Sequence, residues 1–420
     1  MSYKYIKLLL LYAFSAILVF LFSQKEPDTP FYNVRVYLNV FTILLLLSYS
    51  FLVILSNEDT IKKYDKIFFY SLIFILIVLP IFINIISRYR ASNPLVYAHD
   101  GGVIQTEESA RLLLNGKNPY SANFKNTPLI NVGEMGIIVH NPYLPLSFII
   151  TIPFIYICDK LNILFDQRII YLVFYFSVIF FSVYVFKSTN IREVFKIFFA
   201  FNPLLIPFLI HGMNEIYIIS LLFISYSLLI SCKFLSSFLV LGLACSTKQF
   251  AWLIAPFFII YLKATASKNT FYKSIFIFII TLLVFILPFF IWSHFDFIDD
   301  TLLFNAGRSF VNYPLGGTPG IGFSMIHVVS GFVKDKYQYF PCILFIIIFC
   351  LPLFIYLLIR LYREPLHYNI FLYGAIFSSF FIFFSRVFHL NYLFFILFLL
   401  AVGIFNKIDL KSIANIKKKL

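Results

Sequence analysis

Long apolar runs, separated by short polar segments, make up most of this chain. A helix that crosses the hydrocarbon core of a membrane needs about 20 apolar residues, and many of the runs approach that length. The pattern predicts an all-α, polytopic membrane helix bundle of about twelve spans, with residues 1–420 in a single transmembrane domain. The runs expected to form spans are 6–22, 36–56, 67–86, 144–158, 169–186, 194–210, 215–232, 234–246, 249–262, 273–293, 341–361, 367–385 and 389–406.

Two longer polar segments interrupt the apolar runs, at 87–143 and 294–340. Their length predicts loops outside the membrane, and the first loop is expected to carry amphipathic helices at the membrane interface. The expected plan of the chain is two extra N-terminal spans in 1–66, a core with the first loop in 67–293, the second loop in 294–340, and C-terminal spans with a basic tail in 341–420.

The positions of lysine and arginine indicate which ends of the spans face the cytoplasm. Basic residues cluster at 57–66, 187–196, 263–273, 360–363 and 417–419. Placing these clusters in the cytoplasm puts both long polar segments on the extracytoplasmic side. The assignment requires that 144–158 and 169–186 together cross the membrane only once.

Composition excludes a soluble fold and a nucleic-acid-binding domain. Hydrophobic residues make up 61% of the chain and charged residues 12%, whereas about 25% of a soluble domain is charged. The formal net charge of +14 is explained by basic cytoplasmic loops that meet anionic lipid. We therefore expect a lipid bilayer as partner, no nucleic acid, and a multi-pass location in the plasma (inner) membrane.

The most polar stretch, 97–121, reads YAHDGGVIQTEESARLLLNGKNPYS. Asp100 follows His99 and precedes two glycines, which let a backbone approach a ligand closely. This arrangement indicates a functional carboxylate. The simpler alternative is that Asp100 only caps a helix that begins near Val103.

An amphipathic helix is expected directly after this turn. Glu107, Glu108 and Arg111 are predicted on its solvent side, and leucines on the side that faces lipid or protein. Gly116, with Pro119 after it, is typical of the residues that end a helix. We interpret the helix as a scaffold along the membrane interface, and not as a source of catalytic glutamates.

Other polar clusters also lie at the ends of apolar runs, on the same predicted side. The charges of channels and symporters usually lie near the bilayer centre, so this placement favours a site at one membrane interface. Asn214 and Glu215 are candidates to bind sugar hydroxyls or a metal, unless Glu215 only complements a helix N-terminus. Lys248 interrupts an apolar run, where it either snorkels or binds an anion such as phosphate.

The late loops add cations on the predicted extracytoplasmic side. Arg308 lies in the second polar loop, and Arg386 and His389 lie between the last two spans. Arginine suits bidentate binding of phosphate, although an ordinary loop cation is the alternative at both positions. Tyr143, at the start of the run 144–158, is a further candidate to line the site.

Several short segments follow one another along the chain: HDGG at 99–102, LNGKNPY at 114–120, NPYLPL at 141–146, HGMNE at 211–215 and GLACSTKQ at 242–249 with Pro256. Taken in this order, they resemble the GT-C class of membrane glycosyltransferases, which use polyprenyl-phosphate-linked sugars, and in particular its bacterial mannosyltransferase-like members. The chain departs from the class in the two extra N-terminal spans and in Glu215, where many members have aspartate.

The resemblance implies an inverting transferase in which Asp100 is the general base. It implies a polyprenyl-phosphate-linked sugar as donor, a glycan or glycolipid as acceptor, and a site on the extracytoplasmic face. We expect no cofactor and no resident metal, although some members of the class need a divalent cation. The residues expected to bind substrate are His99, Asn214, Glu215 and Tyr143, and those expected to bind the lipid phosphate are Lys248, Arg386, Arg308 and His389.

Two other functions remain open at this point. An O-antigen-type polymerase or ligase has a similar number of spans and a large loop, and would make Arg308 and Arg386 essential but Asp100 dispensable. A lipid-linked glycan flippase or small-molecule transporter would move its substrate without any covalent change.

Overall fold

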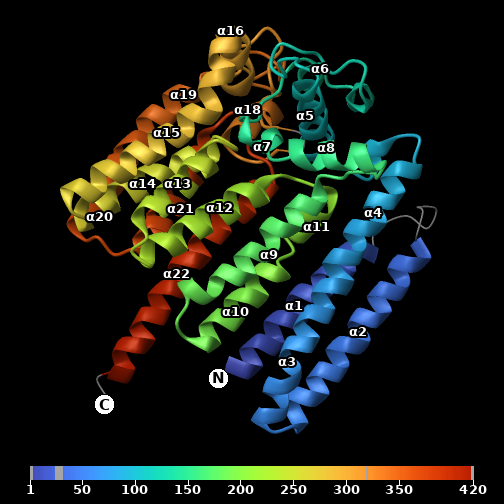
Figure 1. The fold of residues 1–420 in the computed structure, drawn as a ribbon, viewed down its shortest axis with the longest axis vertical. Helices are drawn as coiled ribbons and strands as arrows, with labels where there is room; N and C mark the ends of the chain where they lie inside the picture. The colour runs from blue at the N-terminus through green and yellow to red at the C-terminus, as the bar shows by residue number, and fades with distance from the viewer. Residues whose placement is uncertain (1–2, 24–31, 318–319, 418–420) are drawn as a thin grey trace.

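The computed structural model describes residues 3–23, 32–317 and 320–417, which form helices and connecting loops (Figure 1). Within these ranges no β-strand forms, and only two isolated bridges join residues 316 and 320 to 387 and 389. Seven helical stretches are long and apolar enough to cross a membrane. They are α1 (Tyr3–Ser23), α2 (Tyr32–Leu55), the continuous α3 (Glu58–Ile73), η1 (Phe74–Val78) and α4 (Leu79–Arg90), α9 (Arg168–Val185), α15 (Lys268–Trp292), the continuous α19 (Cys342–Phe345), η6 (Ile346–Cys350) and α20 (Leu351–Arg363), and α22 (Asn391–Lys417).

Shorter helices complete the bundle and its loops. Four of them are apolar but shorter than a full span: α12 (Glu215–Ile230), α13 (Phe234–Cys245), α14 (Phe250–Thr265) and α21 (Tyr368–Phe384). The others are η2 (Pro94–Val96), η3 (Asp100–Gln105), α5 (Thr106–Leu114), η4 (Pro128–Val132), α6 (Met135–Val139), α7 (Leu146–Ile149), α8 (Ile152–Leu161), α10 (Thr189–Ala200), α11 (Ile206–His211), α16 (His294–Ile298), η5 (Asp299–Leu303), α17 (Phe304–Ala306) and α18 (Phe323–Val329). The expected all-helical membrane architecture is confirmed, while the count of about twelve crossings stays a prediction.

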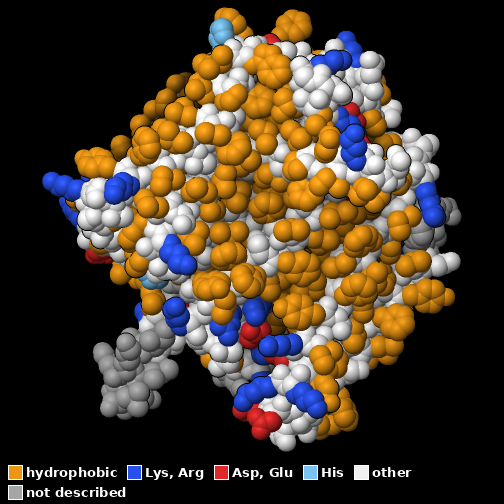
Figure 2. Space-filling model, viewed as in Figure 1, with side chains coloured by type: hydrophobic (Ala, Val, Ile, Leu, Met, Phe, Trp, Pro, Cys, Tyr) orange, Lys and Arg blue, Asp and Glu red, His pale blue; other side chains and the backbone are white. Residues whose placement is uncertain are grey.

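Helix α12 lies at the centre of the bundle and is buried along nearly its whole length. It packs against α9 and α13, and α13 packs against α15, while α21 packs against α14 and α22. The N-terminal helices α1, α2 and α3 stand together on one flank, where α1 touches α10 (Figure 1). Hydrophobic side chains cover the middle of the visible face, and lysines and arginines gather toward its edges (Figure 2). Such a surface suits contact with lipid.

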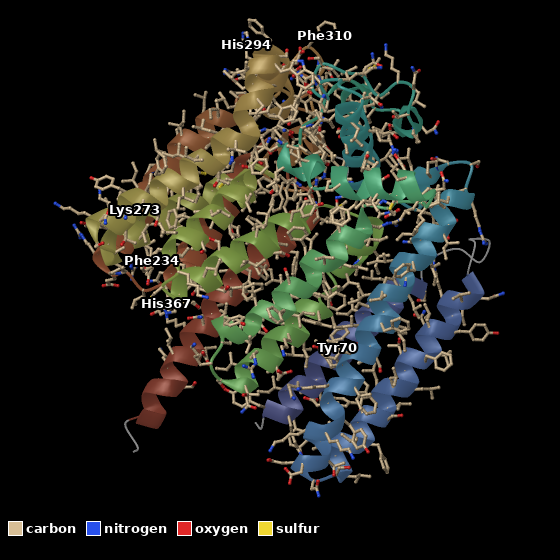
Figure 3. The ribbon with its side chains drawn as sticks, in the orientation of Figure 1. Tyr70, Phe234, Lys273, His294, Phe310 and His367 are labelled. Atoms are coloured by element: carbon tan, nitrogen blue, oxygen red, sulfur yellow. The ribbon has the colours of Figure 1, made fainter. Side chains whose placement is uncertain are left out.

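The bundle has two distinct ends. The turns between α2 and α3, α9 and α10, α14 and α15, and α20 and α21 lie at one end, and the segments 87–143 and 294–340 lie at the other, which we name the loop end (Figure 1). His294 and Phe310 lie at the loop end, whereas Lys273 and His367 lie away from it (Figure 3). The basic clusters at 57–66, 187–196, 263–273 and 360–363 therefore share one end of the molecule, opposite both long polar segments, whereas the predicted basic tail at 417–419 lies mostly outside the described residues.

Two of the expected spans are broken into pieces. Residues 146–161 form the short helices α7 and α8, and α8 lies across the long helices at the loop end, with Phe154, Tyr156 and Ile157 exposed (Figure 1). The run 194–210 is split between α10 and α11. Pro203 and Pro207 fall at that break, because proline lacks the N–H that a continuing helix needs.

Candidate active site

A cavity of about 760 Å³ lies at the loop end. Its polar side comes from loops and helix ends that are far apart in the sequence, and its apolar side includes Trp252 of α14, Ile343 and Ile346 of α19 and η6, and Phe381 of α21. The cavity therefore extends from the polar loops into the helical bundle. All the residues predicted for the site line it: Asp100, His99, Asn214, Glu215, Tyr143, Lys248, Arg308, Arg386 and His389.

Asp100 begins a π-helical turn, η3, and lines the cavity with its side chain about one quarter exposed. The helix starts at Asp100 and not near Val103, and its cap is His99, whose Nδ1 accepts a hydrogen bond from the Gly102 amide at 2.8 Å. The interpretation of Asp100 as the cap is therefore wrong. Its Oδ1 accepts a 2.6 Å bond from the Gly101 amide, and the carboxylate faces the cavity.

The glycines after Asp100 are required by close packing. A Cβ at Gly101 would collide with the hydroxyl of Tyr143, and one at Gly102 would collide with the carbonyl oxygen of Gly212. The turn that carries Asp100 is thus pressed between two other walls of the cavity. The two glycines therefore allow neighbouring protein segments to pack closely against this turn, in addition to any close contact with a ligand.

Helix α5 differs from the expectation at one glutamate. It ends before Gly116, which has φ +69°, as predicted. Glu107, however, is buried, because its carboxylate forms a bidentate ion pair with Arg88 at 3.0 and 2.6 Å and accepts a bond from the Gln167 amide at 2.8 Å. The prediction that Glu107 lies on the solvent side is wrong, since buried polar partners replace water around it.

Glu215 and Lys248 form an ion pair in the cavity wall. Glu215 is the first residue of α12, and its Oε1 lies 2.5 Å from Lys248 Nζ, which also donates to Asn214 Oδ1 at 3.0 Å. Lys248 lies in the break between α13 and α14, as expected. The rings of Tyr143, Phe250 and Tyr392 surround its ammonium group at 5.6 to 5.8 Å. Because Glu215 neutralises this charge, Lys248 is less suited to bind a lipid phosphate than expected.

Two arginines supply positive charge to the cavity. Arg386 donates to the carbonyl oxygens of Tyr313 at 2.6 Å, Gln338 at 3.0 Å and Lys336 at 3.1 Å. Arg308 donates to the Tyr339 hydroxyl at 2.9 Å. Among the described residues, no carboxylate oxygen lies within 4.0 Å of either guanidinium group. A guanidinium has five N–H donors, so unused donors remain on both groups, of which Arg308 is exposed and Arg386 is buried.

His140, Asp299 and Asp300 form the one group in the described ranges with the composition of a metal site. Their ligand atoms lie within 4.8 Å of one another. Hydrogen bonds already occupy these side chains. His140 Nδ1 lies 2.7 Å from Asp300 Oδ1, and the hydroxyl of Ser309 donates to Asp299 at 2.8 Å. The Asn141 amide also donates to Asp300, at 2.8 Å. The cluster fastens the first polar loop to the second.

Stability is expected to depend on pH through Asp300. Burial raises the pKa of this carboxyl from 3.8 to about 6, although the bonds from His140 and Asn141 oppose the shift. A raised folded-state pKa contributes stability that is present at low pH and lost as the pH rises through 6. Between pH 5 and 7.5 the wild type should therefore lose about 1 kcal/mol of unfolding free energy relative to Asp300→Asn. Melting temperatures of both proteins across this range measure the difference. Parallel curves would contradict the prediction, and Asp159→Asn, which alters a half-exposed carboxylate of α8 outside this cluster, is the control that should follow the wild type.

Two residues that line the cavity, Gln249 and Tyr313, are not among those predicted from the sequence. Gln249 donates to the carbonyl oxygens of Pro142 at 3.0 Å and Thr301 at 2.9 Å, which ties three walls together. The hydroxyl of Tyr313 lies 2.9 Å from His389 Nε2. In a chain that is 21% aromatic, a single tyrosine in a loop could not be singled out. Only Gln249, next to Lys248 in an apolar run, had a position that could have identified it.

No family model matches this chain, and no curated protein or solved structure was found to be similar to it. Fold and cavity together define an all-helical membrane protein with a polar cavity at one end of its bundle.

Proposed function

We propose that the protein is a membrane glycosyltransferase that moves a sugar from a polyprenyl-phosphate donor to a glycan or glycolipid acceptor. The observation that supports this most is the combination of groups in one cavity. A partly exposed carboxylate at Asp100, two guanidinium groups with no acidic partner in the described ranges, and an apolar side within the bundle all line it. A carboxylate, an anion site and a lipid-compatible wall are the parts that this reaction requires.

The apolar side of the cavity suits the lipid part of the donor. Leu253, Ile343, Ile346 and Phe381 come from helices whose outer surfaces are apolar. A hydrocarbon chain placed here leaves water without exposing polar backbone. Arg308 and Arg386 border the same cavity, so the phosphate would lie between the polar loops and this apolar side.

The chemistry needs one base and a site for the departing anion. Asp100 accepts the proton of the acceptor hydroxyl while the oxygen of that hydroxyl bonds to the anomeric carbon of the donor sugar. The bond from that carbon to the phosphate oxygen breaks with inversion, and its electron pair leaves with polyprenyl phosphate. Because the leaving group is a phosphate, the cationic charge of the arginines replaces a general acid. One carboxylate suffices, in contrast to the pair that glycosidases use.

The remaining cavity residues suit recognition of the sugar. The neutral Glu215–Lys248 pair and Asn214 offer hydrogen bonds to hydroxyls, and Tyr143 offers an aromatic face. The proposal includes membership of the GT-C class, a bundle of about twelve crossings, and a cavity on the extracytoplasmic face of the plasma (inner) membrane. The basic clusters at 57–66, 187–196, 263–273 and 360–363, at the end opposite the cavity, support this orientation.

Binding of the lipid phosphate can be tested without knowing the sugar. Purified protein in nanodiscs is expected to melt at a higher temperature with polyprenyl phosphate than with the uncharged polyprenol, because only the phosphate engages the arginines. Arg308→Gln should weaken the apparent affinity for polyprenyl phosphate about tenfold. Arg360→Gln, which alters an exposed arginine at the opposite end, is the control. Equal stabilisation by phosphate and alcohol would refute this anion site.

A further inference from the structure

A network of four charged side chains, three of them buried and Arg88 10% exposed, is hydrogen-bonded to the segment that leads into the turn of Asp100. They are Arg88 at the end of α4, Glu107 in α5, Asp166 before α9 and Arg168 at its start. Arg88 bridges Glu107 and Asp166, the latter at 2.8 Å, and Arg168 holds both Asp166 oxygens at 2.8 and 2.7 Å. Two cations and two anions balance, and the Arg168 side chain is fully buried. None of the four is among the described residues that line the cavity.

Arg168 is the member of this network that contacts the segments leading to two walls of the cavity. Its Nη1 donates to the carbonyl oxygens of Tyr97 at 2.6 Å and Ile210 at 3.2 Å. Tyr97 stands three residues before Asp100, and Ile210 stands five before Glu215. One guanidinium therefore holds the two turns that carry the proposed base and the Glu215–Lys248 pair.

The turn that carries Asp100 packs closely against the turn that carries Glu215. The His99 amide donates to the His211 carbonyl at 2.8 Å. Gly212, at φ +97°, has no room for a Cβ, which would strike Val103 and press on the stem of Arg168. The two turns therefore pack against each other and against the Arg168 side chain.

Stability alone is a weak reason for such a network. Apolar residues of similar volume often stabilise a core as well as a buried ion pair does, or better. A guanidinium, by contrast, fixes geometry because its planar donors satisfy a carboxylate and carbonyls at the same time.

We propose that Arg168 is a positioning residue that sets the distance between Asp100 and the Glu215–Lys248 pair. The catalytic consequence rests on the proposed function, whereas the positioning itself does not. Lysine at this position keeps the charge but cannot hold both Asp166 oxygens and two carbonyls.

Hydrogen exchange in nanodiscs tests the positioning without any substrate. In Arg168→Lys, peptides covering 97–105 and 208–215 should exchange several-fold faster, while a peptide covering 187–196 stays unchanged. Asp409→Asn is the matched control, because buried Asp409 holds the turn before α10 through the amides of Lys187 and Ser188 at 2.7 and 2.8 Å. In Asp409→Asn, the peptide covering 187–196 should exchange faster, while those covering 97–105 and 208–215 stay unchanged. Unchanged exchange at both turns in Arg168→Lys would overturn the proposal.

Kinetics then test the consequence. Arg168→Lys should lower kcat by at least about tenfold, toward the roughly 100-fold cost of a 1 Å misplacement, with the KM for the donor within about threefold. Asp409→Asn should leave kcat unchanged. If Arg168→Lys does not fold, Asp166→Asn replaces it, since Asp166 holds the Nε and Nη2 of Arg168 and the loss of its charge should accelerate exchange at both 97–105 and 208–215. A wild type without transferase activity but with the expected exchange pattern would refute the proposed function and leave the positioning role intact.

Discussion

Asp100→Asn is expected to lower the rate of glycosyl transfer by on the order of 1000-fold, because it removes the proposed base. The amide has nearly the shape of the carboxylate, and the side-chain oxygen of the introduced asparagine can still accept the bond from the Gly101 amide that Asp100 now accepts. Melting temperature and binding of polyprenyl phosphate should therefore stay close to those of the wild type. Transfer is measured with purified protein in nanodiscs, as sugar incorporated into the acceptor.

The matched control for this variant is Asp159→Asn. Asp159 is half-exposed in α8 and pairs with Arg111 at 2.9 Å, and it is not among the residues that line the cavity. It should keep full activity. Full activity in Asp100→Asn, combined with loss of activity in Arg308→Gln and Arg386→Gln, would instead favour a polymerase or ligase.

Removing the ammonium group of Lys248 is expected to cause a large loss of stability. Lys248→Met leaves Glu215 as a buried charge without its cation, which costs about 3–5 kcal/mol. The double variant Lys248→Met with Glu215→Leu should recover most of that loss, since an apolar pair of similar volume replaces the ion pair. Melting curves of the two variants give the comparison. If the double variant is less stable than Lys248→Met, the stability lost in Lys248→Met does not come from the unpaired charge of Glu215.

Hydrophobic pattern predicts the helices of this protein well. The runs at 6–22, 169–186, 273–293 and 341–361 each correspond to a long apolar helix. The break around Lys248 and the helix start at Glu215 are also found where the sequence indicates them. Both depend on local signals, since a charged residue inside an apolar run or before it must lie at a helix end or find a partner.

Predictions that depend on distant partners are less successful. Helical periodicity places Glu107 with Glu108 and Arg111, yet Arg88 and the Gln167 amide hold its carboxylate inside the protein. The Asp166–Arg168 pair lies directly before an apolar run, but nothing local shows that Arg168 reaches the turns of Tyr97 and Ile210. The length of the apolar run 144–158 also predicts a span, whereas the structure has the short helices α7 and α8 there, and α8 lies across the bundle (Figure 1).

The most direct test of the proposed function is release of polyprenyl phosphate. Purified protein in nanodiscs is given a panel of polyprenyl-phosphate sugars together with a membrane glycolipid and glycan extract, and mass spectrometry follows the lipid product. The wild type should release one polyprenyl phosphate for each sugar transferred from at least one donor, and Asp100→Asn should release almost none. Donors that cross a proteoliposome membrane unchanged, with no polyprenyl phosphate formed, would contradict the proposed transferase and indicate a transporter.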